Sequence, residues 1–167
     1  MNKYLLCMLS ALCLSMAAPA SIGEEPAKLF KPGTMDLEFM QQQRDRIDEL
    51  ARINLGRQLQ ASRDNDIGIL QALLERRLVR ADQTLELQAM GVVLGDLLAK
   101  ELSMHWIIYE DGHGRSRALQ MGESENVLFP VTMISRRAEA GATVDVMNIY
   151  QKAVNLMAPY RPKLPFQ

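Results

Sequence analysis

The chain has 167 residues and carries 19 Lys and Arg against 20 Asp and Glu, which gives a formal net charge of −1 at pH 7. Nucleic acids and anionic membrane surfaces attract strongly basic proteins, so this balance gives no reason to expect either as a partner. The length suits one domain with a single hydrophobic core.

The N-terminus predicts a cleavable export signal. Lys3 supplies a positive charge, residues 5–18 are uncharged, and the triplet 18–20 (Ala-Pro-Ala) is a small-residue cleavage motif. A retained membrane anchor is the alternative, but this stretch is shorter than the roughly 20 apolar residues that span a bilayer. Lipid attachment is not expected, because Cys7 and Cys13 each follow a leucine and not a small residue. We therefore expect cleavage after Ala20 and a periplasmic or secreted protein.

Cleavage at this point would remove both cysteines. The mature chain would then offer no disulfide, no thiol nucleophile and no cysteine metal ligand. Since the removed segment also holds one cation, Lys3, the net charge would become −2. No second long uncharged run follows, so no membrane span is expected after cleavage. We divide the remainder into a spacer (21–33), one domain (34–157) and an extended Pro-rich tail (158–167).

Three amphipathic helices are predicted in the first part of this domain. The spacer before them holds two prolines, two glycines and four charges, which suits neither a helix nor a strand. Apolar residues then recur at helical spacing over residues 34–60, 67–78 and 82–102. Gly91 and Gly95 lie four residues apart on one face of the third helix. We interpret them as a smooth stripe that lets another backbone approach closely, at a cost of about 1 kcal/mol each relative to alanine.

The pattern changes from helix to strand after residue 102. Aromatic and β-branched residues at 106–109, turn residues at 110–114 and the segments 115–121 and 126–131 predict a three-stranded antiparallel meander. Pro130 cannot donate a hydrogen bond to a sheet, so the third strand should be an edge strand or end there.

Two further helices are predicted at the C-terminal end. The first covers residues 132–140 and is stopped by Gly141, and the second is capped by Thr143. The predicted fold class is therefore α+β, with N-terminal helices packed on a small antiparallel three-stranded sheet and helices after it.

Several short patterns occur in a fixed order between residues 90 and 150. They are Gly91-Val-Val-Leu-Gly95-Asp96-x-Leu98, then Trp106 followed by Asp111 and Gly114, then Phe129-Pro130-x-x-x-Ile134-x-x-Arg137 with Gly141 closing the helix. This stretch resembles the bacterial family of domain of unknown function 3806. The resemblance implies a compact α+β domain. It supplies no information on a reaction, a ligand or a catalytic residue.

A pair of carboxylates could support acid–base hydrolysis. Asp96 and Glu101 are five residues apart and point about 140° apart on an ideal helix, so they cannot share one proton-transfer site. The fold would have to bring Asp111 or Glu110 beside Asp96. We keep a hydrolase that uses Asp96 and Asp111 as an alternative function.

Thioether and imidazole groups gather around residue 105. Met104, His105 and Met121 are of the types that bind Cu(I), and an exported protein would encounter that ion. The other interpretation is that both methionines fill gaps in the core. A Cu(I)-binding periplasmic protein is the less favoured alternative, and no cofactor is expected.

Four arginines form a candidate cationic surface. Arg115 and Arg117 belong to the second predicted strand, and Arg136 and Arg137 belong to the helix after the third. If the sheet brings them together, they could bind a carboxylate or another anionic group.

The sequence contains no motif of an established enzyme class that we can identify. It lacks a Gly-x-Ser-x-Gly elbow and a glycine-rich phosphate loop. The working hypothesis is a non-catalytic exported domain that binds a protein or another component of the bacterial cell envelope.

Overall fold

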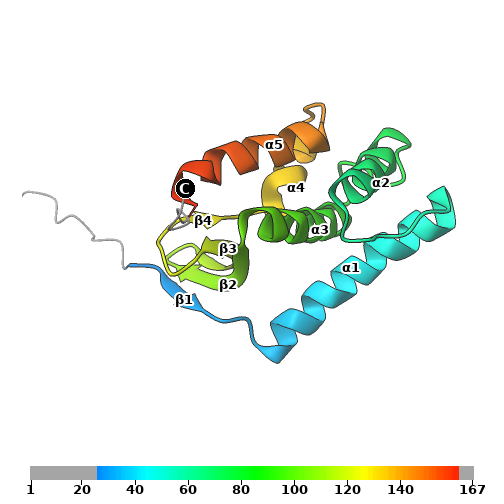
Figure 1. Ribbon diagram of the computed structural model, residues 1–167. Coiled ribbons are helices and arrows are strands. Elements are labelled where there is room, and N and C mark those ends of the chain that lie inside the picture. Colours follow the sequence, from blue (N-terminus) through cyan, green and yellow to red (C-terminus); the bar gives the residue numbers. More distant parts are fainter. Residues whose placement is uncertain (1–25, 162–167) are drawn as a thin grey trace, which may run out of the picture.

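The computed structural model describes residues 26–161, and this part of the chain is a mixed α+β structure (Figure 1). The predicted signal 1–20, the first residues of the spacer and the last six residues of the tail lie outside the described range. No helix within 26–161 is long and apolar enough to cross a bilayer. The elements follow in the order β1 (Lys28–Phe30), α1 (Thr34–Leu55), α2 (Arg63–Glu75), α3 (Thr84–Leu102), β2 (Met104–Asp111), β3 (Gly114–Met121), β4 (Val127–Leu128), α4 (Val131–Glu139), α5 (Val146–Met157) and the 3-10 turn η1 (Ala158–Tyr160).

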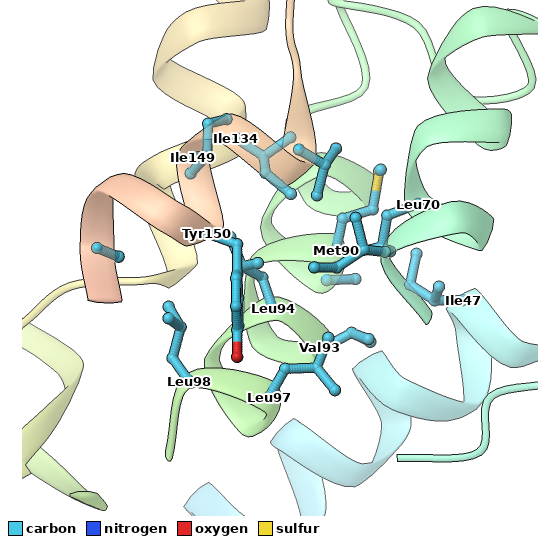
Figure 2. Packing of buried hydrophobic residues seen from close by; sticks show 14 of the residues in the cluster. Ile47, Leu70, Met90, Val93, Leu94, Leu97, Leu98, Ile134, Ile149 and Tyr150 are labelled. Atoms are coloured by element: carbon cyan, nitrogen blue, oxygen red, sulfur yellow. The ribbon is translucent and has the colours of Figure 1, made fainter. Parts of the chain in front are cut away.

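Helix α3 is the centre of the hydrophobic core. It has buried residues on every side, as expected for a helix that is surrounded by protein. Helices α1, α4 and α5 and strand β2 all pack against it. Figure 2 shows side chains of the neighbouring helices converging on those of α3, among them Ile47, Leu70, Ile134, Ile149 and Tyr150 around Met90, Val93, Leu94, Leu97 and Leu98.

The antiparallel sheet of the described residues has four strands in the order β1-β2-β3-β4, so the prediction of three strands was wrong by one. The additional strand is β1, whose residues pair with 108–110 of β2. The prolines, glycines and charges of the spacer 21–33 had predicted neither a helix nor a strand there. All three residues of β1 are exposed, so this strand has no buried face and produces no apolar alternation in the sequence.

The helices form where the periodicity predicts them, but some of their ends differ. Helix α1 stops before Gly56 and not near Gln60, because Gly56 takes a left-handed conformation with φ of 62°. Helix α5 is capped by Asp145 and not by Thr143. The Asp145 carboxylate accepts the backbone N–H of Asn148 at 2.9 Å.

Strand β4 covers only 127–128, whereas the prediction was 126–131. It lies at the edge of the sheet and ends before Pro130, as expected of a residue that cannot donate to a ladder. Gly141 follows α4 with a positive φ of 71°, in agreement with the predicted helix stop. Residues 158–160 form one 3-10 turn, where the prediction was an extended tail.

The glycines of α3 allow close contact with the following elements, which confirms the interpretation of this stripe. A Cβ atom on Gly91 would lie 2.3 Å from the carbonyl oxygen of Val131. On Gly95 it would lie 2.4 Å from the Trp106 ring and 2.8 Å from Cγ of Pro130. The start of α4 and the sheet are therefore both seated on the glycine face of α3.

Candidate functional site

Strand β3 has one edge that is paired throughout and one that is open over half its length. β2 pairs with every residue of β3, whereas β4 pairs only with Leu119 and Gln120. The same register would put Pro130 opposite Arg117, but the chain has left the sheet there and starts α4. Within residues 26–161, the segment 114–118 therefore has no neighbouring strand on this side.

A surface pocket of about 580 Å³ lies beside this open edge, and we call it the β3-edge pocket. Its lining combines the β2–β3 hairpin with the segment that leads into α4 and with one residue of α3. Its larger side chains are Tyr109, His113, Arg115, Arg117, Phe129 and Arg136. Three of the four arginines of the predicted cationic surface thus meet at one pocket.

Two of these arginines are held by Asp36 in the first turn of α1. Its carboxylate accepts hydrogen bonds from Arg115 at 2.9 and 2.7 Å and from Arg117 at 3.2 Å. It also accepts the backbone N–H of Gly33 at 3.2 Å. The Arg115 guanidinium holds the pKa of Asp36 below its ordinary value, although burial acts in the opposite direction. Asp36 is therefore ionised at neutral pH and ties the start of α1 to β3.

The guanidinium of Arg117 is also fixed by Phe39 of α1. Its central carbon lies 4.3 Å from the centroid of the Phe39 ring, which is a cation–π contact. Its Nε is buried and has no hydrogen-bond partner among the described residues. A buried donor without a partner destabilises the fold by about 1–3 kcal/mol. The position of the Arg117 guanidinium is therefore set by its contacts with Asp36 and Phe39 and not by Nε.

Arg136 is the arginine of the pocket that is available to a ligand. It is exposed on α4, and its guanidinium makes no hydrogen bond or ion pair within residues 26–161. Its neighbour Arg137 instead donates to the carbonyl of Met133 in its own helix and does not line the pocket. Arg137 therefore does not share this pocket with the other three arginines of the predicted surface.

The charges around the β3-edge pocket leave a small positive excess. Arg115, Arg117, Arg136 and Asp111 are among its lining residues, and Asp36, which pairs with Arg115 and Arg117, neutralises one further cation. One net positive charge remains among these five residues.

Two aromatic rings supply the apolar part of this pocket. Tyr109 and Phe129 meet edge to face, with ring centroids 5.1 Å apart and an interplanar angle of 85°. Ser116 lies opposite Tyr109 in the register and is too small to cover its ring. An apolar surface therefore lies in the same pocket as Arg136, on the opposite face of the sheet from the side chains of Arg115 and Arg117.

Asp96 and Asp111, the two acids of the predicted hydrolase, line different pockets. Asp96 lies in a pocket between α1 and α3 and accepts two hydrogen bonds from Arg44, at 2.6 and 2.9 Å, and one from the Trp106 indole at 3.0 Å. Asp111 lines the β3-edge pocket and accepts the backbone N–H of His113 at 2.8 Å. Each carboxylate thus has its own structural partners.

Two of the three candidate copper ligands are close to each other and the third faces away. Met104 and Met121 are direct cross-strand partners, and both are buried in the core. His105 is exposed, because successive residues of a strand point to opposite faces of the sheet. The three side chains therefore do not converge. No group of three or more His, Cys, Asp or Glu suitable for a metal ion occurs in the described part of the chain.

Asp36, Phe39 and Arg44 were not predicted from the sequence. Asp36 is the third residue of its helix, and an acid at this position usually serves to cap the helix. Nothing local indicates that it also binds an arginine 79 residues later in the chain. The one signal that the sequence offered for Asp36 was a carboxylate in the first turn of a predicted helix.

The fold and the pocket define a small α+β domain with a cationic and aromatic surface pocket at a sheet edge. The model of one family, Domain of unknown function (DUF3806), matches residues 66–150. The chain belongs to this family, as the resemblance over residues 90–150 predicted. Asp36 and Arg44 lie before the matched region.

Comparison with solved structures supports the fold. The chain is similar to a crystal structure of a protein from Bacteroides thetaiotaomicron VPI-5482, with a TM-score of 0.72 and 17% sequence identity. The similarity covers 80% of this chain and 49% of that one, so the chain spans about half the length of this relative. No functionally curated protein matches the sequence.

Proposed function

We propose that the protein is an exported, non-catalytic binding domain whose β3-edge pocket takes a carboxylate group of its ligand. The observation that carries this proposal is the meeting of Arg115, Arg117 and Arg136 at one pocket. Guanidinium groups recognise carboxylates through paired, charge-assisted hydrogen bonds. Asp36 already positions two of the three groups, and the guanidinium of Arg136 makes no hydrogen bond with any other residue of 26–161.

The aromatic pair adds a second requirement for the ligand. Tyr109 and Phe129 present an apolar surface in the same pocket as Arg136, so a carboxylate that is attached to an apolar group fits the pocket better than a bare inorganic anion does. Proteins and other envelope components carry such groups.

The hydrolase alternative gains no support from the geometry. Asp96 is ion-paired with Arg44 at 2.6 Å, and Asp111 lines another pocket. Two acids that act on one bond must flank one substrate.

Export is part of the same proposal, with cleavage after Ala20 and function in the periplasm or outside the cell. It is supported by the charged, uncharged and small-residue order of the first 20 residues. N-terminal sequencing of the protein from fractionated cells tests it. We expect Ser21 as the first residue in the periplasmic or secreted fraction. An intact Met1 in the cytoplasmic fraction would refute the export proposal.

The binding proposal is tested by titrating the purified protein with succinate and following its backbone amide signals by NMR. Ionic strength is held constant, because salt screens exposed charges. We expect shifts that saturate and that are largest for His113, Ser116, Thr132 and Arg136.

The matched pair of variants is Arg136→Glu and Arg137→Glu. They are neighbours on α4 and change the net charge equally, but only Arg136 lines the pocket. Arg136→Glu should weaken succinate binding at least tenfold, since a hydrogen bond to a charged group contributes about 1.5–3 kcal/mol. Arg137→Glu should leave it within about twofold, because it lacks the direct contact. If both variants weakened succinate binding equally, general electrostatic attraction would explain the binding. The proposal that the pocket binds the carboxylate would then be overturned.

A further inference from the structure

The open edge of β3 carries backbone groups that have no partner in the described structure. The backbone N–H of Met121 donates to the carbonyl of Asn126 at 3.1 Å, so Met121 directs its amide toward the β4 side. Backbone groups alternate in direction along a strand, and Arg115 and Arg117 therefore direct their N–H and C=O groups to this same side. β4 does not reach them.

The chain itself cannot extend β4 along this edge. In the register of β4, Phe129 would face Ala118 and Pro130 would face Arg117, and Pro130 has no N–H to donate and packs against the glycine face of α3. The space that a longer β4 would occupy is where the β3-edge pocket lies, since Gly114 to Arg117 and Phe129 line it from both sides. Unpaired strand edges are templates for another strand, and many peptide-binding domains use them in this way.

We infer that the β3-edge pocket binds an extended peptide segment that pairs as an added strand with the backbone of Arg115 and Arg117. The inference rests on the proposed carboxylate-binding function and specifies its ligand. The register of β3 predicts the chemistry of the peptide. Its side chains on the arginine face lie beside Arg115 and Arg117, where an acidic residue is complementary. The alternate side chains lie on the face of Ser116 and Tyr109, where an apolar residue packs against the aromatic pair.

An extended acidic peptide accounts for two observations, of which a small anion explains only one. A free carboxylate would satisfy Arg136 but would leave the backbone donors and acceptors of Arg115 and Arg117 without partners. A strand satisfies both, and its main-chain hydrogen bonds contribute affinity that does not depend on the peptide sequence.

The test starts with a library of random seven-residue peptides displayed on phage and selected on the full chain. The protein is expressed with its native N-terminal segment, and the product is purified and used with whatever processing the cell has carried out. We expect enriched peptides that alternate acidic and apolar residues. Selection should enrich them at least tenfold less on the Arg136→Glu variant, and equally on Arg137→Glu. Failure to enrich any acidic peptide overturns the inference.

The strand geometry is tested on the enriched sequence, made as a synthetic peptide with single N-methyl groups at successive backbone amides. Only every second amide of a paired strand donates to its neighbour. Methylation should therefore weaken binding at least tenfold at alternate positions and have little effect at the positions between them. The amides of Arg115 and Arg117 should also become protected from hydrogen exchange in the complex.

The outcomes separate this inference from the proposed function. Loss of affinity without this alternation, or peptide binding without protection of the two amides, overturns strand addition. If succinate still binds through Arg136 in that case, the carboxylate pocket stands and its ligand is a small anion. If neither succinate nor an acidic peptide binds, both proposals fail together.

Discussion

Trp106 of β2 donates its indole N–H to the carboxylate of Asp96 on α3 at 3.0 Å, and its ring lies against Gly95, the residue before Asp96. The same carboxylate accepts two hydrogen bonds from Arg44 of α1. One acid thus connects the central helix with the sheet and with the first helix. This contact gives a structural role to Gly95, Asp96 and Trp106, three of the residues on which the resemblance to the family rests.

Replacement of Asp96 by Ala should destabilise the fold by about 2 kcal/mol. It leaves the part-buried Arg44 guanidinium and the Trp106 N–H without their partner, and an unsatisfied polar group of this kind costs about 1–3 kcal/mol. The free energy of unfolding in urea measures the effect. Asp64→Ala is the control, because its ion pair with Arg63 is on the surface and should contribute little. Equal effects of both variants would show that Asp96 does not connect these elements.

Replacement of Gly91 by Ala should destabilise the protein by about 2 kcal/mol, even though alanine favours helix. The added Cβ would meet the Val131 carbonyl at 2.3 Å, and overpacking of this kind costs about 1–3 kcal/mol. Gly68→Ala in α2 is the matched control. Its Cβ would meet only the flexible Arg57 side chain at 3.4 Å, so the helix propensity should raise stability by about 0.5–1 kcal/mol. Thermal unfolding of both variants compares them. A neutral Gly91→Ala would mean that α4 can move away from α3 at little cost.

Asp36 should make the stability depend on pH in the acidic range. Its pKa in the folded protein lies below the ordinary value of 3.8, mainly because Arg115 hydrogen-bonds to the ionised form. The unfolded chain therefore takes up the proton first as the pH falls. The stabilisation by Asp36 is complete above pH 3.8 and is lost as the pH falls through the lower folded value.

This prediction is measured by urea unfolding of the wild type and of Asp36→Asn between pH 7 and pH 3. The variant should be less stable at pH 7, and the difference should shrink toward pH 3. Asp64 and Asp82 also have lowered pKa values, owing to Arg63 and Arg80, but both proteins contain them and their effects cancel in the difference. A difference that stays constant with pH would contradict the ion pair.

Gln43 of α1 is buried, and its Oε1 has no hydrogen-bond partner among the described residues. Replacement by Met, which has a similar shape, should therefore raise the free energy of unfolding by about 1 kcal/mol, because it removes an unsatisfied acceptor. Gln41→Met on the exposed side of α1 is the control and should change little. A destabilised Gln43→Met would indicate that a bound water or another group satisfies this oxygen.

Much of the secondary structure follows from local patterns. The apolar period identified the helices that became α1, α2 and α3, and the switch to β-branched residues identified the β2–β3 hairpin. The errors have local causes. β1 is exposed along its length, and Asp145 outcompetes Thr143 as a cap because its carboxylate reaches the Asn148 amide.

The candidate site was predictable only in part. Arg115, Arg117 and Arg136 were identified by residue type and by their neighbouring predicted elements. Asp36 and Phe39, which hold two of them in place, gave no sign of this role. Arg137 was indistinguishable from Arg136 in the sequence, and the angular difference of about 100° between successive helical residues put one in the pocket and the other outside it.

The sequence by itself determined the helices, the hairpin, the smooth face of α3 and the end of β4 near Pro130, because each depends on residues that are neighbours in the chain. Only the tertiary structure decided that Asp36 ties α1 to β3, that Asp96 and Asp111 belong to different pockets, and that within residues 26–161 the edge of β3 facing away from β2 is unpaired over residues 114–118. These features depend on strand register and on how closely the elements pack on α3. Contacts of that kind join residues dozens of positions apart, and no local pattern encodes them.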